Sequence, residues 1–244
     1  MKAGFLATTI LLALSLAAPT RAQESITIEV KPPVDLNSPN RPQDEIERDQ
    51  WSKPVETFQW IGLEPGDVVV DFHAGGGYAT WILSHWVGPE GVVFTEMSGR
   101  RGDALKERVE TGDLAEVGNV VFAGSIEELP TDSLDVFYVV RNYHDYDADE
   151  ISGFLDHVAR SLKPSGLFVV IDVRAHEGRD EDGHRIAENV VIEETTAAGF
   201  ELVDSTDLLS NPNDTYEGAQ WDNRNQLDHF ALKFRWPENT TAGD

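Results

Sequence analysis

The chain reads Val68-Val69-Val70-Asp71-Phe72-His73-Ala74-Gly75-Gly76-Gly77-Tyr78 at the point that determines its fold. The β-branched run at 68–70 is typical of a short strand buried in a parallel sheet. Large apolar residues then recur at helical spacing from Tyr78 to Trp86, so a helix begins after the glycines. Glycines let a ligand approach the backbone closely, and the first turn of a helix offers free N–H groups. The stretch therefore predicts a strand, a ligand-binding turn and a helix.

Strands and helices continue to alternate beyond this turn. Strands are expected at residues 68–72, 92–96, 120–123, 134–140 and 167–173, and helices near 78–86, 103–110, 151–162 and 185–198. Two further strands, at 200–204 and 229–236, follow without a helix between them, which indicates that the last strand is reversed. The pattern predicts an α/β fold with a Rossmann-like, doubly wound, mostly parallel seven-stranded sheet and a reversed last strand.

The first 22 residues have the pattern of a secretory signal peptide. Lys2 supplies a positive charge, residues 5–18 are mostly apolar, and Ala22 is a small residue suited to cleavage. The apolar run is shorter than the ~20 residues that a bilayer span needs. We therefore expect an exported bacterial protein, periplasmic or extracellular, without stable membrane insertion after cleavage. Residues 23–53 are expected to form an N-terminal arm with a lead-in helix, and residues 54–244 a single domain.

The composition restricts the possible partners. The chain has 44 Asp+Glu against 19 Lys+Arg, a formal net charge of −25, and no Cys. Without a basic surface it cannot neutralise phosphates, so no nucleic-acid partner is expected. The lack of Cys excludes a disulfide scaffold, a thiolate zinc site and a cysteine nucleophile. A small molecule is the expected partner, and the sequence leaves the oligomeric state open.

Glu96 and the glycine turn together indicate a nucleoside-binding site. Glu96 ends the second predicted strand, nineteen residues after Gly77. A carboxylate at that position can accept two hydrogen bonds from a ribose diol. The alternative is that the three glycines only permit a tight turn. A dinucleotide fingerprint is not matched, because the sixth position counted from Gly75 is Thr80 instead of glycine or alanine.

Asp71, Gly75 and Gly77 match the first motif of the class I S-adenosylmethionine-dependent methyltransferases, and the chain resembles that family over roughly residues 54–237. The stretches at 142–145 and 184–186 are similar to a group of predicted exported bacterial methyltransferases. The resemblance implies S-adenosylmethionine as cofactor and a methyltransferase-like domain over 54–244. His73 departs from the pattern, since the family has glycine there. The implied cofactor-binding residues are Asp71, His73, Gly75, Gly77, Glu96, Ser125, Ile126 and Asn142.

The candidate catalytic residues follow the fourth predicted strand, on the same rim of the sheet as the glycine turn. His144 is expected to act as the general base, because imidazole titrates near neutral pH, and Asp145 to orient it. Tyr143 is expected to line the sulfonium, since aromatic faces attract cations. The alternative is that His144 and Asp145 only form a loop hydrogen bond that caps the next helix.

A metal site is not predicted. Asp172, His176 and His184 follow the fifth predicted strand and could join His144 and Asp145 as ligands. No spacing such as H-E-x-x-H supports such a site, however.

The sequence thus predicts S-adenosylmethionine-dependent methyl transfer to an unknown small acceptor by an exported protein. One alternative is a non-catalytic exported binding protein that keeps the methyltransferase fold but has lost cofactor binding, which His73 and the signal peptide favour. A third hypothesis is a nicotinamide-dependent oxidoreductase.

Overall fold

The computed structural model describes residues 34–218, 221 and 224–238 of the chain. The predicted signal peptide and residues 23–33 of the predicted arm lie outside these described residues. Among the helices within the described ranges, none is both long enough and apolar enough to cross a bilayer.

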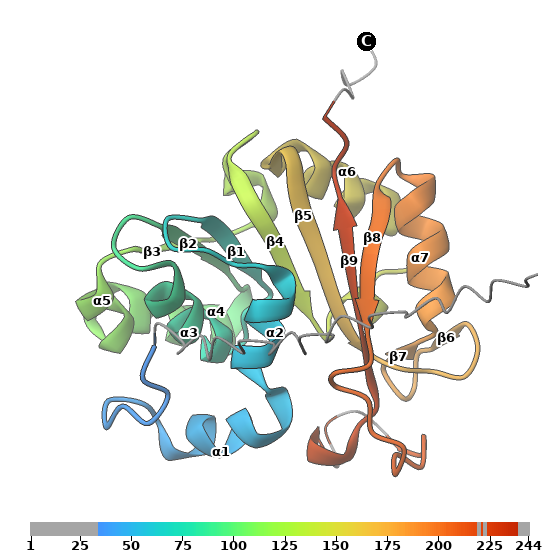
Figure 1. Cartoon of the computed structure of the whole chain (residues 1–244), viewed down its shortest axis with the longest axis horizontal. Helices are drawn as coiled ribbons and strands as arrows, with labels where there is room; N and C mark the ends of the chain where they lie inside the picture. Colours follow the sequence, from blue (N-terminus) through green and yellow to red (C-terminus); the bar gives the residue numbers. More distant parts are fainter. Residues whose placement is uncertain (1–33, 219–220, 222–223, 239–244) are drawn as a thin grey trace, which may run out of the picture. The chain divides into compact units, whose positions relative to one another are not determined.

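The centre of the fold is one seven-stranded sheet. It consists of β1 (Val68–Phe72), β2 (Val92–Glu96), β3 (Val120–Ala123), β4 (Leu134–Val140), β5 (Leu162–Val173), β8 (Glu201–Thr206) and β9 (His229–Arg235). Figure 1 shows the strands side by side in the order β3-β2-β1-β4-β5-β9-β8. The first five strands in this order are parallel to one another, whereas β9 is antiparallel to both β5 and β8. The predicted fold class, including the reversed last strand, is confirmed.

Helices connect the strands and precede the sheet. They are α1 (Gln43–Ser52), α2 (Pro54–Ile61), α3 (Tyr78–Val87), α4 (Gly99–Thr111), α5 (Asp113–Val117), α6 (Ile151–Ser161) and α7 (Glu188–Ala197). Three short 3-10 turns lie at Ile126–Glu128, Tyr143–Asp145 and Arg224–Gln226. The break between α1 and α2 falls at Lys53, whose φ of 42° ends the first helix, and Pro54 starts the second.

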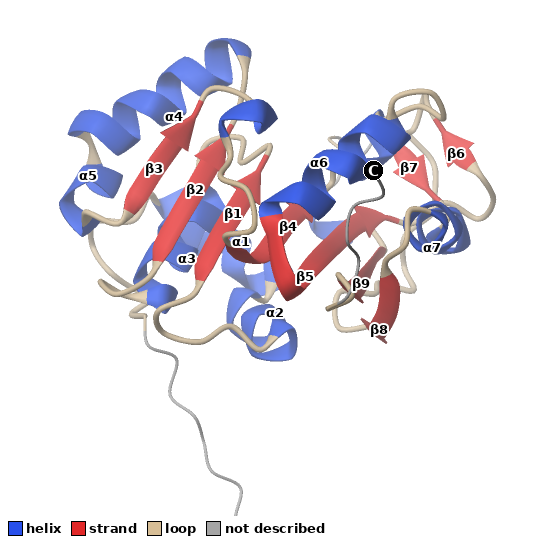
Figure 2. Ribbon diagram, turned by 90° about the horizontal axis from the view of Figure 1, so that it is seen from above, coloured by secondary structure: helices blue, strands red, loops and turns tan. Residues whose placement is uncertain are grey.

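Successive residues of the central strands face opposite sides of the sheet and enter two separate apolar layers. Val69 and Val169 pack in the layer that α2 and α3 cover, whereas Val70 and Val170 pack in the layer under α6 and α7. Figure 2 shows α6 on one side of the central strands, with α2 and α3 on the other. Burial on both faces explains why the strands are continuous apolar runs in the sequence.

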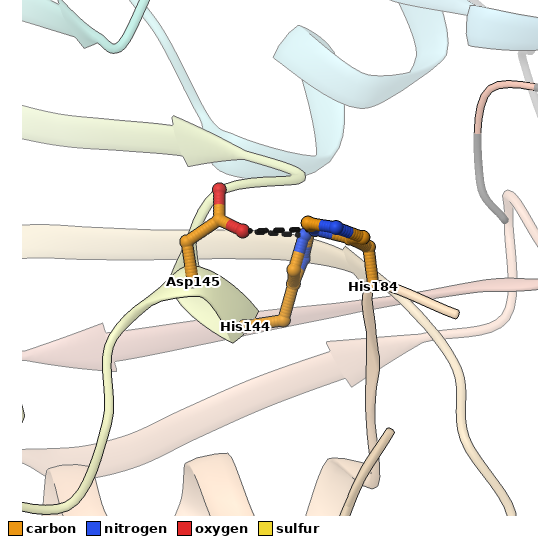
Figure 3. Close-up of side chains that lie close together, drawn as sticks. All are labelled: His144, Asp145 and His184. Carbon is orange, nitrogen blue, oxygen red and sulfur yellow. Dashed lines mark hydrogen bonds and ion pairs between the residues drawn. The ribbon is translucent and has the colours of Figure 1, made fainter. Parts of the chain in front are cut away.

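The structure differs from the predicted elements mainly after β5. The predicted helix at 185–198 begins only at Glu188, because Arg185–Ile186 form a short strand, β7, paired with β6 (Arg179–Asp180). Two-residue strands rich in charge leave no periodic pattern in a sequence. This hairpin places the residue before β7, His184, beside the loop that follows β4 (Figure 3).

Of the three glycines in the turn, Gly77 is the one whose replacement is expected to destabilise the fold. Its φ is +86°, and a Cβ there would lie 2.7 Å from Cδ1 of the buried Leu105. We expect Gly77→Ala to lower the free energy of unfolding by about 2–3 kcal/mol, from left-handed strain plus the clash. Gly75→Ala is the control, because its φ is +61° but nothing lies within 4 Å of the added carbon. Denaturant unfolding that gives equal losses for both variants would contradict the packing argument.

Candidate functional site

The carboxyl ends of β1 and β4 open into a cavity of about 500 Å³. The end of β1 contributes Asp71 to its wall, the turn after β1 contributes His73 and Gly75, and the loop after β4 contributes Asn142 and Asp145. A cavity of this size suits a small ligand. Five of the predicted site residues are therefore brought together. The α1 helix, which sequence reasoning did not place at the site, adds Arg48, Trp51 and Ser52.

Asp71 lies at the base of the turn with its side chain buried. The hydroxyl of Thr80, in the first turn of α3, donates a hydrogen bond of 2.6 Å to Asp71 Oδ2. Burial raises the pKa of Asp71 to about 6, although the Thr80 hydrogen bond and the charge of Arg48 both oppose the rise. The carboxylate therefore ties β1 to α3 and fixes the shape of the turn between them.

Glu96 and His73 contact each other beside the turn. Glu96 Oε2 accepts a hydrogen bond from the His73 backbone N–H at 3.4 Å, and His73 Nδ1 lies 3.3 Å from the same oxygen. His73 Nε2 lies 3.2 Å from the Tyr146 hydroxyl, so the imidazole bridges the two residues. Burial raises the pKa of Glu96 to about 7. The hydrogen bond from the His73 N–H opposes this rise, and the charge of Glu127 adds to it. Burial lowers the pKa of His73, so His73 is neutral at pH 7.

Several predicted site residues do not line the cavity. Tyr143 is fully buried in the layer under α6, and its hydroxyl lies within hydrogen-bond distance of Glu194 and Thr195. Its predicted place beside the sulfonium is therefore wrong. Successive side chains of a 3-10 turn point about 120° apart, and that of Tyr143 points into the core. Gly77 packs against Leu105 instead of the cavity. Ser125 and Ile126 are half-buried around the 3-10 turn after β3, outside the cavity wall.

His144 is held by a carboxylate that the sequence analysis did not pair with it. Asp172, at the end of β5, is completely buried. Its Oδ1 lies 2.7 Å from His144 Nδ1, and its Oδ2 accepts the His144 backbone N–H at 3.0 Å. Asp172 therefore orients His144, a role that we had predicted for Asp145. Since β4 and β5 are parallel neighbours in the sheet, His144 and Asp172 lie at adjacent strand ends. This adjacency is the feature of the sequence from which their contact could have been predicted.

The charge state of His144 conflicts with its predicted role as a base. Burial lowers the pKa of His144, but the charges and hydrogen bonds of Asp172 and Asp145 outweigh burial and raise the pKa to about 9. His144 is then protonated at pH 7, so it cannot take a proton from the molecule that receives the methyl group. Its side chain is also only 2% exposed.

Asp145 links His144 to a second histidine. Asp145 Oδ1 lies 3.2 Å from His144 Nε2 and 3.0 Å from His184 Nδ1 (Figure 3). Burial tends to raise the pKa of Asp145, yet both histidines lower it below its usual value. His184 and Asp145 line the cavity, whereas His144 lies behind them.

Four arginines give the cavity a positive wall in an otherwise acidic protein: Arg48, Arg101, Arg141 and Arg224. Arg48 stacks on the Tyr78 ring at 3.9 Å, and Arg141 lies 5.7 Å from the Trp51 ring. Within the described part of the chain, neither has a carboxylate within 4.0 Å, and Arg141 Nη1 is buried without a hydrogen-bond partner. Burial and the nearby charges of Arg48 and Arg224 lower the pKa of Arg141 to about 10. Such an arrangement is costly unless an anion completes it.

Comparison with known proteins supports the fold and leaves the function open. No family model matches the chain. An arsenite methyltransferase of Halobacterium salinarum is 32% identical over 116 residues, which are 47% of this chain and 29% of the relative. The chain thus matches less than a third of the length of that curated relative.

Solved structures with the same fold include proteins of different activity. A SAM-dependent methyltransferase from Aquifex aeolicus aligns with a TM-score of 0.60 at 20% identity, over 83% of this chain and 97% of that one. The cyclase SpnF aligns with a TM-score of 0.60 at 14% identity, over 77% of this chain and 82% of its own. The fold is therefore that of SAM-dependent methyltransferases, and the fold alone does not determine the reaction.

Proposed function

We propose that the protein transfers a methyl group from S-adenosylmethionine to a small anionic acceptor. The observation that carries the proposal is a glycine turn that opens into a cavity of about 500 Å³, with the buried carboxyl of Glu96 bonded to the backbone of that turn. Glu96 contacts His73, which lines the cavity, but is not itself part of the cavity wall. The methyltransferase activity of the relative from Halobacterium salinarum supports the same conclusion.

The residues around the turn suit a nucleoside with an amino-acid tail. A Cβ at Gly75 or Gly76 would meet no atom within 4 Å, so the space over the turn is open to a ligand. Glu96 can accept hydrogen bonds from ribose hydroxyls, and Arg48 can pair with a carboxylate. His73 fits less well, because its imidazole already contacts Glu96, and the ribose must share or displace that contact.

The arginines indicate the class of acceptor. When bound, S-adenosylmethionine supplies an electrophilic methyl group on a sulfonium, which an acceptor anion takes by in-line displacement. Arg48 accounts for one anionic group, the carboxylate of the cofactor. Arg141, on the opposite loop after β4, remains for a second anion, which is the acceptor. An acceptor that arrives as an anion needs no general base, which agrees with a protonated His144.

The acceptor differs from that of the relative from Halobacterium salinarum. Arsenite contains a soft arsenic(III) centre, for which thiolates are the favoured ligands. This chain has no Cys. The buried guanidinium of Arg141 instead suits a hard oxyanion such as a carboxylate, a phenolate or a phosphate.

Methyl transfer is tested with S-adenosylmethionine that carries a deuterated methyl group. A panel of small carboxylic acids, phenols and phosphates is compared with neutral alcohols by mass spectrometry of the labelled product. We expect transfer to an anionic compound, and a loss of at least tenfold in Arg141→Met with little change in cofactor affinity. Absence of both cofactor binding and transfer would favour the non-catalytic binding protein, which has lost cofactor binding. Cofactor binding without transfer to any compound of the panel would contradict an anionic acceptor of these classes. Binding of a reduced nicotinamide cofactor alone would favour the oxidoreductase.

The affinity for the cofactor should depend on pH through Glu96. Only the ionised carboxyl accepts two hydrogen bonds from the ribose, and its pKa is about 7 in the free protein because of burial. The dissociation constant of S-adenosylhomocysteine should therefore be about tenfold higher at pH 6 than at pH 8. Burial lowers the pKa of His73, so the titration of this imidazole is moved away from that of Glu96. Calorimetry on Glu96→Gln should give weaker binding without the pH dependence, and a wild-type curve that is flat would contradict this role.

We also propose that the protein is exported, on the basis of residues 1–22. Expression in a Gram-negative bacterium and N-terminal sequencing of the periplasmic fraction test this proposal. The expected first residue is Gln23, and a full-length chain confined to the cytoplasm would contradict export.

A further inference from the structure

A cluster of two imidazoles and one carboxylate lies at the edge of the cavity, where the sequence predicted no metal. His144, Asp145 and His184 each direct one ligand atom at the same space, and these atoms lie within 4.8 Å of one another (Figure 3). We infer that these three residues bind a divalent first-row transition-metal ion. The proposal does not depend on methyl transfer, because it concerns binding of the ion itself.

The distances between the ligand atoms match those around such an ion. His144 Nε2 and His184 Nδ1 lie 3.2 and 3.0 Å from Asp145 Oδ1. Metal–ligand bonds of ~2.1 Å at tetrahedral or octahedral angles place neighbouring ligand atoms about 3.0–3.4 Å apart. Small rotations of the Asp145 and His184 side chains, which are both partly exposed, would therefore admit an ion.

Asp172 prepares His144 for this role. A carboxylate can only accept, so the 2.7 Å contact with Asp172 Oδ1 places the proton of the imidazole on Nδ1. Nε2, which faces Asp145 at 3.2 Å, is then the nitrogen that releases its proton when the metal ion binds. Asp172 is itself fixed, because it accepts the backbone N–H groups of His144 and Val173 at 3.0 and 2.7 Å. A carboxylate behind a ligating histidine in this way is the usual outer shell of protein metal sites.

His184 is held toward the site by a strained hairpin. Its φ is +53°, a conformation that non-glycine residues adopt at a cost and that is concentrated at functional positions. The β6–β7 ladder and the hydrogen bond from the Gly183 N–H to Asp180 Oδ1, 3.0 Å long, maintain this turn. His184 is 39 residues from Asp145 in the chain, so no local spacing could reveal the pair.

The ligand set indicates the kind of ion and what it can do. Imidazole suits zinc, iron, nickel and copper, whereas magnesium and calcium prefer oxygen ligands. Three protein ligands leave at least one position open, and Asp145 and His184 face the cavity. An ion with two neutral imidazoles and one carboxylate keeps a net positive charge. It would therefore bind an oxyanion in the same cavity as Arg141.

The test is calorimetric titration of the untagged full chain with Zn²⁺ after treatment with a chelator, and with Mg²⁺ for comparison. We expect one Zn²⁺ per chain and much weaker binding of Mg²⁺. His184→Ala, whose side chain is partly exposed, should weaken Zn²⁺ binding at least 100-fold. Asp172→Asn should weaken it about 10–100-fold. His157→Ala, on α6 and away from the cluster, should leave it unchanged.

Thermal unfolding of each variant shows that it is folded before it is titrated. Absence of Zn²⁺ binding to the folded wild-type chain would overturn the proposal. Equal affinity in the wild type and His184→Ala would also overturn it, because the ion would then be elsewhere. Since S-adenosylhomocysteine binding is measured without metal, failure of this test leaves the methyl-transfer proposal to be judged on its own.

Discussion

Replacing Arg185 by Met is expected to lower the free energy of unfolding by about 3–5 kcal/mol. The side chain of Arg185 is 1% exposed and that of Asp214 is 5% exposed. The two form a bidentate pair, with distances of 2.8 and 3.2 Å from the guanidinium nitrogens to the two carboxylate oxygens. Loss of the guanidinium leaves the Asp214 carboxylate buried without its cation, which is among the costliest effects of a single substitution.

Two further variants separate this explanation from a general loss of packing. Arg160→Met removes a charge from the exposed face of α6 and should change the free energy of unfolding by less than about 0.5 kcal/mol. The double variant Arg185→Met/Asp214→Leu removes both buried charges and should recover part of the lost stability. Denaturant unfolding measures these variants together with the single variant Asp214→Leu, which the comparison requires. If the double variant is as unstable as the sum of its single substitutions, the two charges do not act as a pair.

Replacing Glu96 by Ala is expected to weaken the binding of S-adenosylhomocysteine by about 100-fold. Two hydrogen bonds from ribose hydroxyls to a carboxylate contribute at least ~3 kcal/mol together, which corresponds to that factor in the dissociation constant. Loss of the carboxyl should not unfold the domain, because burial disfavours the ionised form of Glu96 and raises its pKa to about 7. Its removal therefore takes away a group whose charge is unfavourable in the free protein.

Glu90→Ala is the matched control for this variant. Glu90 is exposed in the turn before β2, at the opposite end of the strand from Glu96. Its removal changes the net charge by the same amount and should leave the affinity for S-adenosylhomocysteine unaltered. Equal affinities in wild type, Glu96→Ala and Glu90→Ala would mean that the ligand does not contact Glu96.

The fold could be predicted from the sequence because its signals are local. Val68–Phe72 and Leu134–Val140 are continuous apolar runs, since both faces of the sheet are covered. The absence of a helix between residues 204 and 229 indicated the antiparallel β9. The β6–β7 hairpin could not be predicted, because two-residue strands depend on tertiary contacts and leave no periodicity.

The candidate site was predictable only where a residue adjoins a strand end. Asp71 and Glu96 follow from the position of β1 and β2 and lie beside the turn as expected. The direction of each side chain in the loop after β4 could not be predicted. Tyr143 consequently entered the core, while its neighbour Asp145 faces the cavity. The contact between Asp145 and His184 depends on the hairpin, so the candidate metal site emerged only from the structure.

Binding of S-adenosylmethionine in the cavity beside the glycine turn underlies the proposed function. Calorimetric titration of the wild-type chain with S-adenosylhomocysteine at pH 8 tests it most directly, because Glu96 is ionised at that pH. We expect saturable binding of one ligand per chain at micromolar concentrations. Absence of any heat of binding up to millimolar ligand, from a chain shown to be folded, would contradict it.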